Sequence, residues 1–305
     1  MRKLKRKYLI KKHYIKLFLA PVLWGGALVG GRIIAGNLPP FTITLLRFII
    51  VSLFSLPILY FKNGRLPIPS CKAVFHLMVL GLSGVLMFNF FLFSGLRTVS
   101  AIRSSIFISV SPFVVLLSSG LVFHEKITKQ SLTGIILGFS GAIITITNGN
   151  ISLLYSKGIS AGDLFLVGCI FSWTIYSISA KYALVHLTPL TMLAYSSVLG
   201  VVFLIPFALK EGVLSTLGTQ PSSTWLSLLY LSIGASGLAH IFYYQGIKAV
   251  GTSRSAIFLN LEPVAAISLS IIILGETLSY SLLTGAVLVI SGLLLTNYKK
   301  MEVQI

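Results

Sequence analysis

The sequence predicts an all-α integral membrane protein of ten transmembrane helices, arranged as two inverted five-helix repeats. Composition is the first reason: 55% of the 305 residues are hydrophobic and only 10% are charged, whereas a soluble domain carries roughly 25% charged residues. The second reason is an internal repeat. Landmark residues recur after 149 to 151 positions, as in Trp24/Trp173, Pro40/Pro189, Gly95/Gly246, Arg103/Arg254, Pro112/Pro263, Glu125/Glu276, Gly134/Gly285 and Gly141/Gly292.

The ten predicted spans are apolar stretches of roughly the 20 residues that a membrane helix needs. They cover 15–35, 40–61, 73–95, 99–123 and 130–147 in the first half, and 161–184, 189–210, 224–246, 252–274 and 280–297 in the second. The predicted domain plan is a basic N-terminal segment at 1–14, a first repeat at 15–147, a linker at 148–160, a second repeat at 161–297 and a tail at 298–305.

The net charge of +18 does not indicate nucleic-acid binding, because the basic residues flank the apolar spans. Eight of the 24 Lys and Arg residues lie within the first sixteen positions. The positive-inside rule then places both termini in the cytoplasm, although Lys157 and Lys210 fall on the opposite side. The basic head is also expected to contact anionic membrane lipid. Five spans per repeat is an odd number, so the second repeat enters the membrane from the opposite side.

No cofactor and no metal site are predicted. Cys71 borders a span and Cys169 lies within one, so a disulfide is not expected, and neither belongs to a Cys/His cluster. The sequence has no GxxxxGK[ST] motif, which argues against ATP as the direct energy source.

Pro112 and Pro263 occupy equivalent positions near the middle of the fourth and ninth spans. A proline inside a helix lacks the backbone donor and clashes with the preceding turn. Each should therefore bend its span and free the carbonyl four residues earlier, at Ile108 and Leu259. A carbonyl freed at membrane depth must face protein or water. The bends are either packing kinks or hinges, and their duplication favours hinges.

Glu262 lies about ten residues into the ninth span, or roughly 15 Å deep at 1.5 Å per residue. A charge at this depth costs about 2.5–3.5 kcal/mol on insertion scales, so the group should be protonated, paired or exposed to a water-filled cavity. Its candidate roles are binding a cationic group of a substrate, carrying a proton, and forming a structural hydrogen bond. Arg47 is a second deep charge and a candidate partner, although its length also lets it reach toward the surface.

Polar and aromatic residues within the spans predict a mostly apolar substrate cavity with few polar anchors, suited to a small amphipathic solute. Two alternatives stay open. The tryptophans can anchor at the membrane interface, and His240 can be a packed residue rather than a proton relay. The candidate cavity residues are Trp24, Asn89, Ser105, Ser109, Trp173, Tyr176, His240, Tyr243, Tyr244, Asn260 and Glu262.

Glu125 and Glu276 end the fourth and ninth spans at equivalent positions. They are either solvated charges at helix ends or gates that contact a basic loop residue of the other half. The inverted arrangement places Glu125 on the cytoplasmic side and Glu276 on the other, as a pair of gates requires. Glycines in the fifth and tenth spans allow close helix contact and predict a scaffold, with a homodimer surface as the alternative.

Short motifs occur in the same order in both halves. The chain opens with Leu23-Trp24-Gly25, Leu38-Pro39-Pro40 and Leu46-Arg47-Phe48, and it closes with Asn260-Leu261-Glu262-Pro263-Val264, Leu274-Gly275-Glu276, Gly285 and Ser291-Gly292-Leu293. The first half carries a weaker copy of the closing pattern: Ser109-Val110-Ser111-Pro112, His124-Glu125, Gly134 and Ser140-Gly141. Together these motifs resemble the EamA-type repeats of the drug/metabolite transporter superfamily, over nearly all of the chain. One departure is Ser111, which stands where the second repeat has Glu262.

The resemblance implies a ten-helix carrier of the bacterial cytoplasmic (inner) membrane, often an exporter of amino acids, other metabolites or drugs. The predicted function is therefore gradient-driven secondary transport of a small solute by alternating access, in the direction of export, with protons as a candidate second partner. A non-transporting receptor or assembly partner is one alternative. A membrane-embedded lipid-modifying enzyme is another, but the six acidic residues are scattered rather than clustered.

Overall fold

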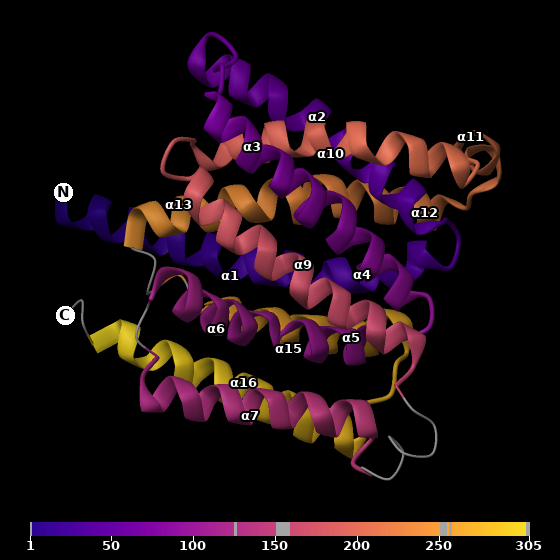
Figure 1. The fold of residues 1–305 in the computed structure, drawn as a ribbon. Coiled ribbons are helices and arrows are strands. Elements are labelled where there is room, and N and C mark those ends of the chain that lie inside the picture. The colour runs from indigo at the N-terminus through magenta and orange to yellow at the C-terminus, as the bar shows by residue number, and fades with distance from the viewer. Residues whose placement is uncertain (1, 125–126, 151–158, 251–254, 256–257, 303–305) are drawn as a thin grey trace.

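The computed structural model is a bundle of long helices that run roughly side by side (Figure 1). It describes residues 2–124, 127–150, 159–250, 255 and 258–302. Within these ranges, side chains are described except at 2–12, 219, 244, 247–248, 250 and 297–302. The predicted linker at 148–160 therefore lies mostly outside the described residues, as does the start of the ninth predicted span.

The first repeat crosses the bundle five times. Its helices are α1 (Arg2–Ala35), α2 (Pro40–Asn63), α3 (Cys71–Leu80) continued by the π-helix η1 (Gly81–Met87) and α4 (Phe88–Leu96), α5 (Ala101–Ile108) followed by α6 (Ser111–Phe123), and α7 (Lys129–Thr147). The basic head is helical and continuous with the first span, so α1 begins at Arg2.

The second repeat has the same plan. Its helices are α9 (Ala161–Ala183), α10 (Pro189–Lys210), α12 (Ser222–Leu229) continued by the π-helix η3 (Tyr230–Leu238) and α13 (Ala239–Val250), α15 (Leu261–Leu274) and α16 (Tyr280–Glu302). The short α11 (Val213–Thr216) and the 3-10 turn η2 (Leu217–Thr219) lie between α10 and α12. The bounds agree with the predicted spans to within about five residues wherever the chain is described, except that α1 begins at Arg2 and not at position 15.

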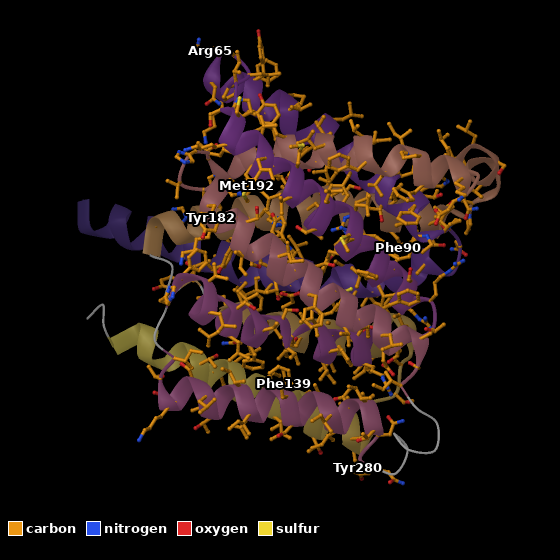
Figure 2. The ribbon with its side chains drawn as sticks, in the orientation of Figure 1. Arg65, Phe90, Phe139, Tyr182, Met192 and Tyr280 are labelled. Atoms are coloured by element: carbon orange, nitrogen blue, oxygen red, sulfur yellow. The ribbon has the colours of Figure 1, made fainter. Side chains whose placement is uncertain are left out.

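The structure is that of a multi-pass membrane protein. Among the described residues, eight helices are long and apolar enough to cross a membrane, and two shorter apolar helices, Leu261–Leu274 and Tyr280–Thr296, complete the set. Large apolar side chains face outward, such as Leu121, which is 81% exposed, and Ile272, which is 76% exposed. Phe139 lies on the outer surface of α7 (Figure 2). This exposed apolar belt matches a lipid environment.

The two repeats are inverted with respect to each other. Both ends of the described chain lie on one side of the bundle (Figure 1), and we call this the terminal side; the opposite side, where α1 ends at Ala35 and α2 begins at Pro40, is the far side. Equivalent helices of the two repeats pack together, α2 against α10 and α7 against α16. The first helix of each repeat packs against the third helix of the other, α1 against α13 and α9 against α4.

Local sequence signals define where the helices begin. Serine and threonine side chains accept a hydrogen bond from the amide three residues ahead, which satisfies one of the free donors of the first turn. The capping residues are Ser70, Ser100, Thr128, Ser160 and Thr188. Pro40 and Pro189 occupy the first helical position of α2 and α10, where a missing amide proton costs nothing.

Glycines bring α7 and α16 into close contact within the chain. A Cβ atom added to Gly292 would lie 2.4 Å from the carbonyl oxygen of Gly134, and one added to Gly141 would lie 2.6 Å from that of Gly285. These four glycines are therefore used inside one protomer, as the predicted scaffold requires. They do not need a second copy of the chain to explain them.

We expect Gly292→Ala to lower the free energy of unfolding by about 1–3 kcal/mol, the cost of forcing extra volume into a packed interface. Thermal unfolding of the detergent-purified protein measures this change. Gly218→Ala is the matched control, because a Cβ atom there meets nothing within 4 Å. Equal unfolding temperatures for the two variants would contradict the packing described here.

Candidate functional site

The third helix of each repeat widens into a π-helix at the same place. η1 and η3 occupy equivalent positions, since Gly81–Met87 shifted by 151 residues falls within Tyr230–Leu238. In a π-helix the amide bonds the carbonyl five residues back, as Phe88 does with Ser83 and Ala239 with Gly234. Such turns concentrate at functional sites and leave carbonyl groups in need of other partners.

A polar side chain follows each π-helix and contacts its exposed carbonyls. Asn89 Nδ2 donates to the carbonyl oxygens of Gly84 at 2.9 Å and Val85 at 3.0 Å. In the second repeat, His240 Nδ1 lies 3.3 Å from the carbonyl oxygen of Ala235. Asn89 and His240 are 151 residues apart, as are Gly84 and Ala235, so the two contacts are related by the repeat. A carbonyl can only accept, so the His240 contact requires the proton on Nδ1.

Arg47 joins the two π-helical regions. From α2 of the first repeat, its Nη1 donates to Asn89 Oδ1 at 2.9 Å. Its Nε and Nη2 both donate to Ser236 Oγ of η3, at 3.1 and 2.9 Å. Ser236 in turn donates to the carbonyl oxygen of Leu231 at 3.0 Å. The predicted pairing of Arg47 with Glu262 is absent among the described contacts, and Arg47 instead binds neutral groups of both repeats.

Trp24 places α1 against the second π-helix. Its Nε1 donates to the carbonyl oxygen of Ala235 at 2.9 Å, the same oxygen that His240 contacts. The indole ring packs edge-on against the rings of His240 and Tyr243, with centroids 5.1 and 5.4 Å apart. Trp24 therefore lies in the interior of the bundle and is not an interfacial anchor.

The equivalent tryptophan makes an equivalent cluster in the other half. Trp173 of α9 stacks on Tyr176 at 5.1 Å and packs against Phe88 at 5.3 Å, directly after η1. The Tyr176 ring also lies against Gly84, where an added Cβ atom would be 2.2 Å from a ring carbon. Two aromatic clusters thus cover the two π-helices from opposite repeats.

The fourth span is broken at the predicted proline. α5 ends at Ile108 and α6 begins at Ser111, with Pro112 at the start of the new helix. The amide of Val110 bonds the carbonyl of Phe107, a tighter turn than an α-helix. The second repeat has its counterpart at Asn260, after which α15 begins with Leu261 and carries Pro263 as its third residue. The sequence predicted a bend at each proline, whereas the structure has a break between two helical segments.

Glu262 lies in the first turn of α15, directly after this break. Its backbone carbonyl packs against Gly25 of α1, next to Trp24. The side chain is half-buried and makes no hydrogen bond or ion pair with any described residue. The predicted structural hydrogen bond is therefore not formed in the described part of the chain. The partial positive charge of a helix N-terminus favours a carboxylate at this position.

The remaining candidate cavity residues differ in accessibility. Ser105 and Ser109 bond backbone carbonyls of their own helix, at Ile102 and Ser105, so their donors are already used. Asn260 is buried, and its Nδ2 has no hydrogen-bond partner among the described residues. Tyr244 lies in α13, but its side chain is outside the described residues.

Two carboxylates of the second repeat cap helices of the first repeat on the far side. Glu276 Oε1 accepts from the amide of Ala101 at 2.7 Å and Oε2 from that of Ile102 at 2.9 Å, at the start of α5. Glu211 accepts from the amides of Phe41 and Thr42 at 3.2 and 2.7 Å, at the start of α2. Glu276 thus joins the two halves as a gate would, but through backbone amides instead of a basic side chain.

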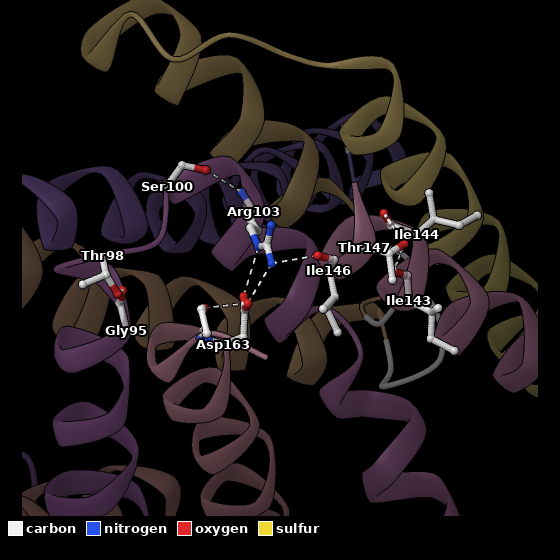
Figure 3. A network of polar contacts seen from close by, with 10 residues as sticks. Gly95, Thr98, Ser100, Arg103, Ile143, Ile144, Ile146, Thr147 and Asp163 are labelled. Carbon is white, nitrogen blue, oxygen red and sulfur yellow. Dashed lines mark hydrogen bonds and ion pairs between the residues drawn. The ribbon is translucent and has the colours of Figure 1, made fainter. Parts of the chain in front are cut away.

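An ion pair adds a third link on the far side (Figure 3). Arg103 of α5 binds Asp163 of α9 through two parallel hydrogen bonds, Nε to Oδ1 at 3.0 Å and Nη2 to Oδ2 at 2.7 Å. Nη2 also donates to the carbonyl of Ile146 at 3.1 Å, and Ser160 donates to Asp163 at 2.6 Å. The Asp163 side chain is only 2% exposed.

The terminal side has different contacts. Lys16 donates to Gln245, and Tyr195 donates to the carbonyl oxygen of Pro67 at 2.6 Å. A recess of about 400 Å³ lies there between the repeats, lined by residues of 63–73 and 186–191. The other predicted gate, Glu125, lies outside the described residues.

Arg103→Ala should lower the free energy of unfolding by about 3 kcal/mol, because it leaves the buried Asp163 without its counter-charge. Asp163→Ala should cost less, since Arg103 is 19% exposed and can turn toward solvent. A double-mutant cycle on the purified protein measures the coupling, which should exceed 1 kcal/mol. Independent, additive effects would contradict this pairing.

The structure brings Trp24, Asn89 and His240 together around the π-helices. The structure also places Arg47 and Ser236 in this region, although they were not among the candidate cavity residues. On the far side it brings in Glu211, Arg103 and Asp163, which were not candidates either. One signal in the sequence indicates this region: Asn89 and His240 occupy equivalent positions of the two repeats, and both lie within otherwise apolar stretches.

Comparisons with known proteins all point to one family of membrane transporters. The model of the EamA-like transporter family matches residues 11–147 and again 160–298. An uncharacterized transporter of Archaeoglobus fulgidus is 31% identical, covering 95% of this chain and 98% of that protein. A probable amino-acid metabolite efflux pump of Salmonella typhimurium is 27% identical, covering 90% and 91%. A solved crystal structure shares the fold with a TM-score of 0.64 at 21% identity, covering 94% of this chain and 97% of that one.

Proposed function

Because the chain belongs to the EamA-like transporter family, we propose that it is a secondary carrier that exports a small metabolite, amino acid or drug-like solute by alternating access. The observation that supports this most is the duplicated π-helix. Each repeat supplies one, each is covered by a tryptophan of the other repeat, and Arg47 connects them. A site built equally from two inverted halves is the usual place for substrate in secondary transporters.

The proposed substrate cavity lies along this interface. Arg47, His240 and Glu262 are polar side chains within the spans, and each is only half-buried. Trp24, Trp173, Tyr176 and Tyr243 are also half-buried and supply an aromatic wall, while the breaks at Pro112 and Pro263 serve as hinges.

The gates differ between the two sides. On the far side three acidic residues hold the repeats together, Asp163, Glu211 and Glu276. The positions equivalent to Glu211 and Asp163 in the first repeat are Lys62 and Tyr14, 149 residues earlier, and neither carries a carboxylate. We therefore propose that this conformation is closed on the far side and that export requires these links to open.

We propose that the protein lies in the cytoplasmic membrane with the terminal side in the cytoplasm. The bias of Lys and Arg toward this side supports the orientation. The relative described as a probable amino-acid metabolite efflux pump supports export and amino acids as a substrate class.

The proposal is tested by flux in sealed proteoliposomes that contain only this protein. We expect at least one solute in a panel of amino acids and other small metabolites to move faster when a proton or solute gradient is imposed. Addition of a protonophore and liposomes without protein are the controls. A broad panel with no gradient-dependent flux above the empty liposomes would contradict secondary transport.

Glu262→Gln tests whether this carboxyl group carries the coupled proton. Gln keeps the size but cannot release a proton, so the variant should lose the dependence of flux on the pH gradient while still exchanging solute. Glu302→Gln, at the end of α16, is the matched control and should behave as the unaltered protein. An unchanged rate and an unchanged pH profile in Glu262→Gln would remove Glu262 from proton coupling.

A further inference from the structure

Arg47 carries a charge that the described residues do not neutralise. Its three donor nitrogens contact Asn89 Oδ1 and Ser236 Oγ, which are both neutral. The one ion pair between described side chains is elsewhere, between Arg103 and Asp163. A guanidinium group stays charged in proteins, and a charge inside a membrane span is by default a functional group with a partner.

The two neutral acceptors are held in fixed orientations by their own hydrogen bonds. Asn89 uses its amide nitrogen on the η1 carbonyls, so its oxygen must face Arg47. Ser236 uses its hydroxyl proton on Leu231, so its oxygen can only accept from Arg47. These oriented dipoles hold the guanidinium in place without cancelling its charge.

The Nε–Nη2 edge of Arg47 has two donors but only one acceptor atom. Both nitrogens donate to the single oxygen of Ser236, at 3.1 and 2.9 Å. This edge is the fork that matches the two oxygens of a carboxylate in parallel hydrogen bonds. The pair Arg103–Asp163 in the same molecule shows the arrangement, with Nε and Nη2 each bound to its own carboxylate oxygen.

We propose that Arg47 binds the carboxylate of the transported solute through its Nε–Nη2 edge, and that this carboxylate replaces Ser236 as the acceptor. The assignment rests on the proposed carrier function and names its substrate class. Nη1 keeps its bond to Asn89, so the arginine stays anchored to the first repeat while it binds the solute.

The exchange of acceptors couples binding to movement of the repeats. Ser236 belongs to the second repeat and Arg47 to the first, so displacement of Ser236 removes a link between them. A ligand shifts a conformational equilibrium only by the contacts that differ between the two states. Here the differing contact is the Arg47–Ser236 bond, which the solute carboxylate replaces.

The surroundings favour a solute that carries an apolar or aromatic group beside its carboxylate. Ala235, the neighbour of Ser236, accepts a hydrogen bond from Trp24 Nε1, and the indole ring packs against the rings of His240 and Tyr243. The site therefore fits a carboxylate with an apolar or aromatic side chain, which inorganic phosphate lacks.

The test measures ligand stabilisation of the purified full-length protein with matched acid and amide pairs. The probes are L-leucine against L-leucinamide, L-phenylalanine against L-phenylalaninamide, and inorganic phosphate. We expect at least one acid to raise the unfolding temperature with an affinity at least 10-fold above that of its amide, and phosphate to have no effect. The comparison uses the unaltered chain, so it does not depend on how well a variant folds.

Variants separate binding from a structural role. Arg47→Gln should weaken acid binding about 10- to 100-fold, the loss expected for a charge-assisted pair, and Arg47→Lys about 10-fold, because an ammonium lacks the fork. Ser236→Ala should bind the acid at least as tightly as the unaltered protein, since the displaced acceptor is gone. Ser223→Ala, at an exposed position of α12, is the control and should leave acid binding unchanged.

Equal binding of acid and amide would overturn the assignment, as would phosphate binding in place of the acids. A loss of acid binding in Ser236→Ala as large as in Arg47→Gln would show that the contact is structural, which also overturns it. Stabilisation by none of the acids counts against it as well. Gradient-driven flux of an uncharged or cationic solute by the same preparation would then leave the carrier function standing while the carboxylate site fails.

Discussion

The central region depends on the rule that a backbone carbonyl inside a membrane must find a donor within the protein. In each π-helix, carbonyl groups accept hydrogen bonds from side chains. Asn89 supplies the donor in the first repeat, and His240 together with Trp24 supplies it in the second. These polar side chains therefore bond backbone groups at the interface between the repeats.

Arg47 extends this network from one repeat to the other. It is anchored by the Asn89 side chain that satisfies η1 and by the Ser236 hydroxyl within η3. The far-side links through Glu211, Glu276 and Asp163 follow the same logic, because each carboxylate bonds a helix terminus or a charge of the first repeat. Polar contacts therefore join the second repeat to the first in two places, near the middle of the bundle and on the far side.

The sequence was sufficient to predict the ten spans, the inverted repeat and the family. The lengths of the apolar stretches and the repeated residues can be read from it directly. Capping residues such as Ser100 and Thr188 also agree with the observed helix starts. The π-helices could not be predicted, since a π turn adds one residue without changing the apolar character of the stretch. The partners of Arg47, Glu211 and Glu276 in the other repeat lie 169 to 189 residues away along the chain, and local patterns carry no information at that separation.

The central claim is that the region around the two helix breaks opens to each side of the membrane in turn. It is tested most directly by a single cysteine at Asn260, in a chain with Cys71→Ser and Cys169→Ser, labelled by a membrane-impermeant maleimide added to one side of sealed, oriented vesicles. We expect labelling from both sides, with a transported solute changing the ratio between them. Labelling from neither side, or from one side only under every gradient and solute condition, would contradict it.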